Sequence, residues 1–328
     1  MDKSETTVYY FDMKTNLRHV PHFRAPSWCF NGHVHTIARS LFGDSQQPPL
    51  NRIEIPTPDE DFLELDCHIN PESDAIITLF HGLEGSTDRY YMVEIMKTLI
   101  DKGYSVVGVN FRGCGSKLNN QPRFYHSGET DDYHTVFKWV TEKYPGKKIG
   151  AVGFSLGGNA LIKYLGETGE YGLVDTAVAV SVPYDLRLGS IILSKGFHRI
   201  YEYRFLRTLR EKLNKKRKRF PDLPKFSGST IYEFDDQVTA PIHGFEDADD
   251  YYEQCSGRRF TADIAIDTLL VHSKEDPLCP VEAMPLAKIN QNPYTDYIIT
   301  GEGGHVGFWS KPRGWLNFVI ENYLSSNL

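Results

Sequence analysis

The chain has 328 residues, of which 40% are hydrophobic and 24% are charged, so it is long enough to bury a sizeable core. Its formal net charge of −7 argues against a general attraction to nucleic acid. Residues 1–14 contain acidic side chains instead of a basic region followed by an apolar run, so they do not resemble a secretory signal. No apolar stretch reaches the ~18 residues of a membrane-spanning helix. We therefore expect a cytoplasmic protein with at most peripheral membrane contact.

The cysteines are odd in number and scattered, and no two of them have the C-x-x-C spacing (Cys29, Cys67, Cys114, Cys255 and Cys279). This arrangement argues against a disulfide framework and against a zinc site, and it suits reduced thiols. We expect no metal and no cofactor.

Apolar runs and segments with helical spacing alternate along most of the chain. After an expected antiparallel pair, Arg52–Thr57 and Phe62–Ile69, the expected strands are Ala75–Phe80, Tyr104–Phe111, Lys148–Phe154, Thr176–Val182, Ile266–Ser273 and Asp296–Thr300. The expected helices between and after them are Asp88–Lys102, Glu129–Lys143, Leu156–Leu165, Val281–Ile289 and Trp315–Leu324. This alternation predicts an α/β fold with a mostly parallel, doubly wound sheet, which binds ligands beyond the carboxyl ends of its strands.

Residues 184–260 interrupt this alternation and differ in composition. Between Lys195 and Arg219 there are eleven Lys or Arg residues, and between Glu233 and Glu253 there are eight Asp or Glu residues. We expect 184–260 to form a helical cap, 52–183 and 261–328 to form the core, and 1–51 to pack on it as an extension. The apolar positions expected in the first half of the cap are Ile200, Tyr203, Phe205, Leu206, Leu209 and Leu213.

The charges and aromatic residues of the cap support two further expectations. The run Lys215–Arg219 is interpreted as a solvated helix end that the acidic half neutralises, with anionic lipid and nucleic acid as alternatives. A cap neutralised in this way could close over an uncharged ester. We expect its aromatic residues to form an apolar pocket for short to medium acyl chains (Phe197, Tyr201, Tyr203 and Phe205).

Gly153-Phe154-Ser155-Leu156-Gly157 fits the G-x-S-x-G pattern. Five residues often match by chance, but this motif follows a buried strand and opens a helix, which is the context that a nucleophile elbow requires. The sharp turn holds its central residue in an unfavourable backbone conformation, so the residues two positions to either side must lack side chains. Ser155 is therefore the predicted nucleophile, and a serine here indicates acyl transfer through a covalent acyl-enzyme.

Acyl transfer also needs two backbone N–H groups aimed at the developing oxyanion. We expect one from Leu156, directly after the nucleophile. The other is expected from the loop HGLEGS at residues 81–86, with Leu83 as the best candidate. His81, in the same loop, is expected to have a structural, hydrogen-bonded role.

The acid and the base of such a site follow the serine in the order Asp or Glu, then His. Of the two histidines after residue 260, His272 lies inside an apolar strand, whereas His305 lies in the glycine-rich loop GEGGHVGF and is the predicted base. Asp276, in SKEDPLCP, is the predicted acid, and Asp185, at the end of an earlier strand, is its rival. Cys279 follows Asp276 by three residues, so we expect it near the active site without a catalytic role.

With these motifs together, the sequence resembles the α/β-hydrolase superfamily. Within it the chain is similar to the YheT-like hydrolases (AB hydrolase-4 family), whose eukaryotic relatives are monoacylglycerol-lipase-like proteins related to a plant embryogenesis-associated protein. The resemblance runs from about Ala25 to Trp315 and rests on FNGHVHTI, HGLEGS, NFRGCG, YHSGETDD, GFSLGGN, EDPLCP and GGHVGF. It implies hydrolysis of carboxylic esters, often lipid-like acyl esters. Eukaryotic relatives carry a membrane-spanning segment near the N-terminus, and this sequence resembles the bacterial type without one.

Other residues match family positions without an evident chemical role, and we interpret them as structural (His33, His35, Arg112 and Asp131). A thioesterase, a peptidase or an acyltransferase would use the same acyl-enzyme as an esterase. A non-catalytic binding protein on a hydrolase scaffold is disfavoured because all three triad positions are filled in the right order. The expected partner is a small-molecule ester and not nucleic acid.

Overall fold

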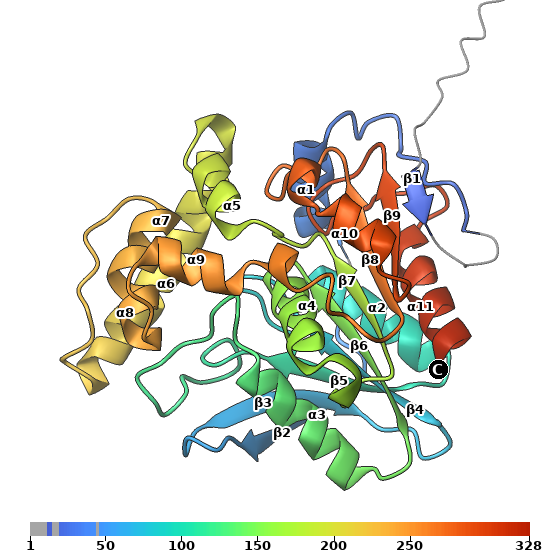
Figure 1. The fold of residues 1–328 in the computed structure, drawn as a ribbon, viewed down its shortest axis with the longest axis horizontal. Coiled ribbons are helices and arrows are strands. Elements are labelled where there is room, and N and C mark those ends of the chain that lie inside the picture. The colour runs from blue at the N-terminus through green and yellow to red at the C-terminus, as the bar shows by residue number, and fades with distance from the viewer. Residues whose placement is uncertain (1–11, 15–19, 44–45) are drawn as a thin grey trace, which may run out of the picture.

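The structure, a computed structural model, describes residues 12–14, 20–43 and 46–328 (Figure 1). The strands of the described residues form one sheet in the order β1-β9-β8-β7-β6-β4-β5-β3-β2. They are β1 (Asp12–Lys14), β2 (Asn51–Pro56), β3 (Phe62–His68), β4 (Ala75–Phe80), β5 (Ser105–Asn110), β6 (Lys148–Phe154), β7 (Thr176–Val180), β8 (Thr268–Ser273) and β9 (Thr295–Thr300). Strands β4 to β9 are parallel, whereas β1, β2 and β3 pair antiparallel with their neighbours. The predicted mostly parallel sheet and the antiparallel pair at its start are confirmed.

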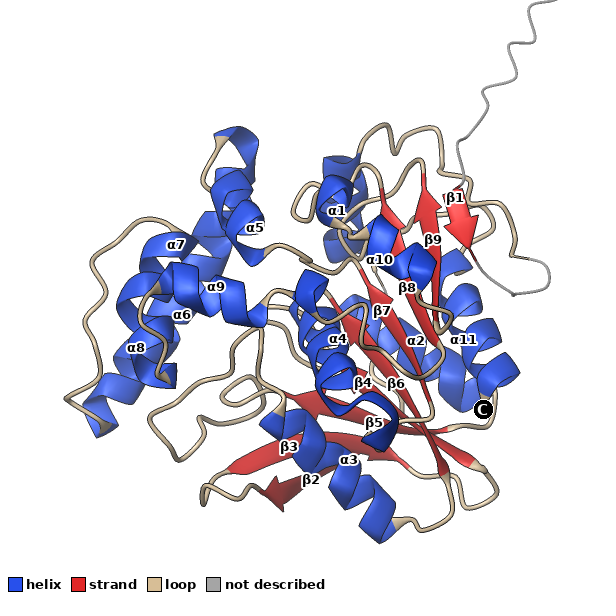
Figure 2. Ribbon diagram, viewed as in Figure 1, coloured by secondary structure: helices blue, strands red, loops and turns tan. Residues whose placement is uncertain are grey.

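Helices cover both faces of the sheet (Figure 2). α2 (Tyr90–Asp101) and α11 (Trp315–Asn327) pack on one face, and α3 (Asp131–Lys143) and α4 (Leu156–Thr168) pack on the other. Successive side chains of a strand point to opposite faces, so one apolar run serves both cores. In β4, Ile77 belongs to the core under α2 and α11, and Phe80 to the core under α3 and α4.

Residues 184–260, called the cap below, leave the sheet after β7 and return to it at β8. Its helices are α5 (Leu186–Leu193), α6 (Arg199–Arg219), α7 (Ile231–Phe234), α8 (Ala240–His243) and α9 (Ala248–Cys255). They lie to one side of the sheet, beyond its carboxyl edge (Figure 1). The cap has a small apolar core of its own, which contains Leu206, Leu213 and Phe234.

Three local features differ from the sequence prediction. The helix expected at Val281–Ile289 is a 3₁₀ turn, Val281–Ala283, followed by α10 (Leu286–Gln291), because Pro285 between them has no N–H to donate. Helix α1 (Gly32–Phe42) and strand β1 were not predicted. α1 begins at Asn31, whose side chain accepts a hydrogen bond of 2.9 Å from the Val34 N–H, as an N-cap residue does.

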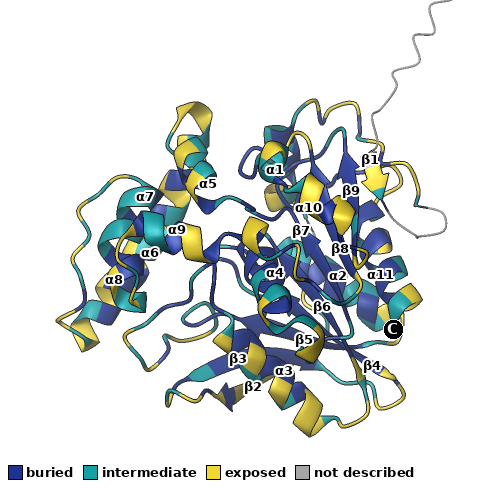
Figure 3. Cartoon of the chain, viewed as in Figure 1, coloured by how far each residue is buried: buried dark blue, intermediate teal, exposed yellow. Residues whose placement is uncertain are grey.

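The expected neutralisation within the cap is wrong. No ion pair of the described residues joins the basic half of the cap to its acidic half; two of the basic side chains turn instead to the core. The Lys212 ammonium lies 2.6 Å from the Glu84 carboxylate, and the ammonium of Lys216 donates to the carbonyls of Gln121 and Arg123. Two expected apolar positions, Ile200 and Tyr203, are exposed. Figure 3 shows exposed stretches, in yellow, on the cap helices. No helix among the described residues is both long and apolar enough to cross a membrane.

Candidate active site

Ser155 lies between the end of β6 and the start of α4, near the middle of the parallel sheet. Its φ of 54° is in the left-handed region, which L-residues rarely adopt, so the turn is strained. The Ser155 N–H donates to the Val180 carbonyl at 2.8 Å, which fixes the turn against β7. The predicted elbow geometry is therefore present.

The flanking glycines are required, but by a different neighbour than the sequence suggested. A Cβ at Gly157 would lie 2.5 Å from the His81 carbonyl oxygen, at the end of β4. A Cβ at Gly153 would lie 2.6 Å from the Gly157 carbonyl oxygen. The glycines thus let the first turn of α4 approach the strand ends, rather than making room for Ser155 itself.

The structure brings the predicted base and acid to this serine. His305, in the loop after β9, has its Nε2 2.7 Å from Ser155 Oγ. The opposite ring nitrogen, Nδ1, lies 3.0 Å from Asp276 Oδ2 and 3.2 Å from Oδ1. With Nδ1 protonated toward the carboxylate, Nε2 is left as an acceptor for the serine hydroxyl, which is the arrangement of a serine–histidine–aspartate triad.

Burial disfavours the ionised form of Asp276, but its partners more than compensate. Its carboxylate faces His305 and accepts hydrogen bonds from the N–H groups of Leu278 at 2.9 Å and Cys279 at 3.0 Å. The net effect lowers the pKa of Asp276 below its usual value, so the carboxylate is ionised at neutral pH. Burial and the Asp276 charge together raise the pKa of the Cys279 thiol well above its usual value, so this thiol is neutral, although it lies beside the site.

Helix α1 supports the loops that carry the acid and the base. The His305 N–H donates to Thr36 Oγ1 at 2.9 Å, and Thr36 Oγ1 donates to the Gly32 carbonyl at 2.7 Å. A Cβ at Gly32 would lie only 1.7 Å from the Glu275 carbonyl oxygen, so α1 touches the backbone directly before Asp276. Val306, which follows His305, has a φ of 47°, and its N–H donates to Ser181 Oγ at 3.1 Å.

The rival residues have other partners. Asp185 caps α5 by accepting from the Leu188 N–H at 2.9 Å, and it also forms an ion pair with Arg258. His272 is buried, as predicted, and its Nε2 lies 2.8 Å from the Cys279 carbonyl oxygen. His81 accepts from the Phe111 N–H through Nε2 at 3.2 Å and contacts the Gly82 carbonyl through Nδ1, so both ring nitrogens are used structurally.

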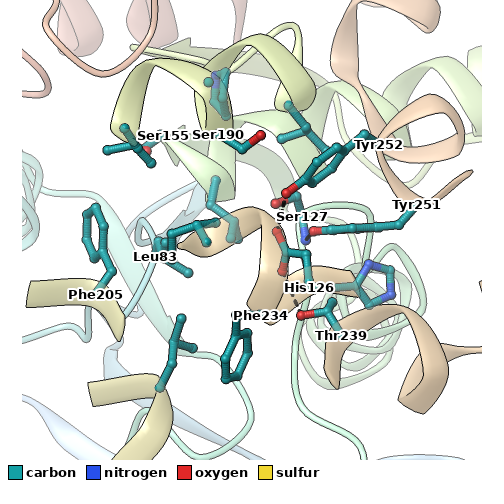
Figure 4. Close-up of a pocket in the computed structure, with 18 of the residues that line it drawn as sticks. Leu83, His126, Ser127, Ser155, Ser190, Phe205, Phe234, Thr239, Tyr251 and Tyr252 are labelled. Atoms are coloured by element: carbon teal, nitrogen blue, oxygen red, sulfur yellow. Dashed lines mark hydrogen bonds between the residues drawn. The ribbon is translucent and has the colours of Figure 1, made fainter. Parts of the chain in front are cut away.

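Three backbone N–H groups of the loop HGLEGS donate hydrogen bonds within the protein. Gly82 donates to Tyr91 Oη at 2.9 Å, Glu84 donates to Tyr125 Oη at 2.7 Å, and Gly85 donates to the Gly82 carbonyl at 3.0 Å. The N–H of Leu83 has no acceptor among the described residues, and its side chain lines the same pocket as Ser155 (Figure 4). Leu156 is the first residue of α4, where backbone N–H groups have no intrahelical partner.

A pocket extends from Ser155 into the space between the core and the cap (Figure 4). Its wall near the serine and along the cap is mainly apolar (Leu83, Phe124, Leu186, Leu193, Phe205, Leu209, Ile231, Phe234 and Leu278). Of the cap aromatics expected to line it, Phe205 does so. The expectation is wrong for Phe197 and Tyr203, which are exposed, and for Tyr201, which packs on Leu278.

The opposite wall of the pocket is polar, and we call it the polar wall (His126, Ser127, Ser190, Asp235, Thr239, Tyr251 and Tyr252). Figure 4 shows His126, Ser127, Thr239, Tyr251 and Tyr252 on the side away from Leu83 and Phe205. Asp235 accepts from Thr239 and Tyr252, each at 2.7 Å. Burial raises the pKa of Asp235 to about 6, despite those two hydrogen bonds.

Among the described residues, one cluster outside the triad has metal-ligating side chains, His126, Glu129 and His243. Arg123 already forms an ion pair with Glu129. Burial, and then neighbouring positive charge that includes Arg123, lower the pKa of His126 and His243. A divalent cation would be repelled by the same charges, so the donor set does not fit a metal.

Of the four residues interpreted as structural, Arg112 and His33 make structural contacts. The buried Arg112 guanidinium lies 2.8 Å from Asp59, 2.9 Å from Asp61 and 2.7 Å from Asp132. Asp131 is exposed, so the structural interpretation does not extend to its side chain. His33 Nδ1 lies 3.1 Å from Tyr201 Oη, which joins α1 to α6. His35 is buried, and burial lowers its pKa to about 4.

Sequence reasoning missed several residues that hold the site in place. Thr36 and Ser181 hold the loop that carries His305, and Tyr91 and Tyr125 hold the loop HGLEGS. The contact between Thr36 and His305 spans 269 residues, so no local spacing could reveal it. The sequence signals were two motifs, FNGHVHTI, which contains Thr36, and YHSGETDD, which begins at Tyr125.

Comparison with known proteins gives consistent results. A family model described as the alpha/beta hydrolase fold matches residues 75–312. The putative esterase YheT of Escherichia coli is 36% identical over 91% of this chain and 91% of its own length. Phospholipase ABHD3 of Homo sapiens is 28% identical over 91% of this chain and 77% of its own length.

Among solved structures, the Pyrococcus furiosus esterase Pf2001 aligns with a TM-score of 0.58. It is 22% identical and covers 85% of this chain and 92% of its own, a similarity that concerns the fold. Together with the strand order and the serine elbow, these matches settle the family. The chain belongs to the α/β-hydrolase family and, within it, to the branch that includes YheT.

Proposed function

We propose that this chain is a serine hydrolase of carboxylic esters, with Ser155 as nucleophile, His305 as general base and Asp276 as the acid that orients the base. The observation that carries the proposal is the hydrogen bond of 2.7 Å between His305 Nε2 and Ser155 Oγ, with the Asp276 carboxylate on the other side of the ring. The relatives named as an esterase and as a phospholipase support an ester as the substrate.

The reaction follows from these positions. His305 takes the proton of the Ser155 hydroxyl while Oγ attacks the ester carbonyl carbon. The ionised Asp276 stabilises the imidazolium, which then gives its proton to the departing alkoxide as the acyl-enzyme forms. The same imidazole activates water, which attacks the acyl-enzyme and releases the carboxylic acid. In both steps the backbone N–H groups of Leu83 and Leu156 hold the oxyanion.

The pocket supports an uncharged ester with a short to medium acyl chain as the finer substrate class. The apolar wall beside Ser155 would cover the first methylenes of an acyl chain, and each buried methylene contributes about 0.8 kcal/mol. A longer chain would reach the polar wall, where it would have to desolvate groups such as Asp235 without bonding to them. Affinity should therefore rise with length and then stop rising.

A fluorophosphonate probe tests the nucleophile. It should label the wild-type protein at Ser155, as located by mass spectrometry of the digested protein, and should not label Ser155→Ala. Ser190→Ala is the matched control, because Ser190 lines the same pocket and its removal should leave labelling intact. Labelling of another serine, or undiminished labelling of Ser155→Ala, would contradict the assignment.

A series of p-nitrophenyl esters below their micelle-forming concentrations tests the pocket. kcat/KM should climb from acetate to about hexanoate, by up to roughly fourfold for each methylene, and then flatten or fall. Leu209→Phe should shift the optimum to shorter chains, because Leu209 lines the pocket. Tyr203→Phe, on the same helix but exposed, should leave the series unchanged. A flat series would exclude this pocket as the acyl site.

A further inference from the structure

Exposed large apolar side chains are concentrated in one part of the molecule. Of the twelve such side chains among the described residues, eight lie within 28–42 and 191–203. Six of these, which we call the apolar edge, are each more than half exposed (Phe30, Leu41, Phe42, Phe197, Ile200 and Tyr203). Scattered exposed apolar residues are ordinary, but a concentration of this kind marks an interaction surface.

The two segments form one surface because α1 and the start of α6 lie side by side. The rings of His33 and Phe197 are 4.9 Å apart, and those of His33 and Tyr201 are stacked at 5.8 Å. Further along both helices, Arg204 Nη1 of α6 lies 3.5 Å from Ser40 Oγ of α1. The contacts of His33 with Tyr201 and of Ser40 with Arg204 advance along both helices in the same sense, so the two segments lie next to each other.

The cap side of the apolar edge is positively charged. Lys195, Arg199, Arg204 and Arg207 are exposed on the same stretch of chain. The acid among them, Glu202, is buried and accepts a hydrogen bond from the Ile231 N–H at 2.9 Å, so it does not face these cations. Burial, and then the positive charges of Arg89 and Arg207, lower the pKa of Arg204.

The inner side of the same segments lines the active-site pocket. Leu193 and Phe205 lie on either side of the exposed stretch and contribute to the apolar wall. Tyr201 of α6 packs on Leu278 and Cys279, next to the loop that carries Asp276.

We propose that the apolar edge and its adjacent cations form a docking surface for an anionic lipid bilayer, so that the protein binds membranes at this face. Exposed aromatic and aliphatic side chains insert into the boundary between lipid headgroups and acyl chains, and lysine and arginine beside them are attracted to anionic headgroups. The chain as a whole is negative, with a net charge of −7, so binding has to come from this local surface and not from overall charge.

The test is co-sedimentation of the Ser155→Ala chain with vesicles, which separates lipid binding from hydrolysis. It should bind vesicles that contain phosphatidylcholine and phosphatidylglycerol, more weakly as salt is added. Phe197→Ser/Ile200→Ser should reduce the partition coefficient by about tenfold or more. Phe318→Ser, on α11, is the matched control because Phe318 is similarly exposed outside the edge, and it should bind as well as Ser155→Ala.

A second pair of substitutions tests the charge. Arg199→Glu/Arg207→Glu should weaken binding to anionic vesicles by at least about fivefold for each residue and leave the weaker binding to phosphatidylcholine alone unchanged. Hydrolysis of water-soluble esters by the otherwise wild-type variants should stay the same. Absence of binding to both vesicle types, equal loss in Phe318→Ser, or a dimer in light scattering that Phe197→Ser/Ile200→Ser dissociates would overturn the proposal. The last result would identify a second copy as the occupant.

Discussion

The sequence predicts which residues meet at the carboxyl edge of the sheet, but it does not predict which way the apolar side chains of the cap face. At the edge, Ser155, Asp276 and His305 each follow a buried strand, and parallel strands bring their ends together whatever lies between them in the chain. In the cap, α6 contacts the cap core, the pocket and solvent on different sides, so its apolar residues serve three purposes. The comparison indicates that the sheet brings the three predicted triad residues together, while the cap supplies much of the pocket wall beside them.

The largest expected effect tests the sheet side of this comparison. Ser155→Ala should lower kcat for a p-nitrophenyl ester by on the order of 10⁴-fold or more, because the three triad groups act as one unit. The strained φ of 54° is a property of the turn, so the variant should keep its fold, which circular dichroism and thermal unfolding can verify. Full turnover by a correctly folded variant would remove Ser155 from the mechanism.

The second effect distinguishes the two candidate acids. Asp276→Asn should reduce kcat by roughly 10³–10⁴-fold, because an amide neither stabilises the imidazolium nor selects its correct tautomer. Asp185→Asn is the matched control, since Asp185 is engaged with the α5 N-terminus and Arg258. It should change kcat by less than about tenfold, with some loss of stability through the cap. A greater loss of kcat in Asp185→Asn would reverse the assignment.

That Ser155, Asp276 and His305 lie together could be predicted because their sequence signals are local or depend only on their order along the chain. The strand–turn–helix around Ser155 is contained in about twenty residues. Asp276 and His305 followed from their order along the chain and from their positions after strands. The mostly parallel sheet followed from continuously apolar runs, whose residues all prove to be buried in β4, β5 and β7.

The remaining features depend on contacts between distant residues. Periodicity marks Ile200 and Tyr203 as apolar but cannot tell whether an apolar side chain faces a core or solvent. The ammonium of Lys216 is buried against backbone carbonyls about 95 residues earlier in the chain, which no charge count reveals. The supporting role of Thr36 depends on α1, an element that was identified only as a motif.

A third prediction concerns α1, which links the two regions by touching both the acid loop and α6. In Gly32→Ala the new Cβ would overlap the Glu275 carbonyl, so α1 or the Asp276 loop must move. A displacement of about 1 Å can reduce turnover up to 10²-fold, so we expect kcat to fall about 10- to 100-fold. Ser40→Ala, on the exposed side of the same helix, should keep wild-type kcat and KM. Equal kcat in Gly32→Ala would show that α1 only covers the site.

The smallest expected effect concerns Asp235, the cap residue in the polar wall of the pocket, and appears as a dependence of stability on pH. The pKa of Asp235 is about 6 in the folded protein and about 3.9 in an unfolded chain. The folded state therefore binds the extra proton between about pH 4 and 6, and the unfolded state does not. Stability from this group is present below pH 4 and is lost as pH rises through about 6, because the ionised carboxylate is then buried.

Asp235→Asn should remove this dependence. Relative to wild type, Asp235→Asn should be more stable at about pH 7.5 than at about pH 4.5. The difference between the two free energies of unfolding, variant minus wild type, should grow by roughly 1–2 kcal/mol between these pH values. Urea unfolding at both pH values measures the difference. Ser190→Ala, an uncharged change in the same pocket, should shift stability equally at both. If Asp235→Asn, like Ser190→Ala, shifts the free energy of unfolding equally at both pH values, Asp235 is ionised at both. The polar wall then carries a negative charge, which would itself exclude anionic substrates from the pocket.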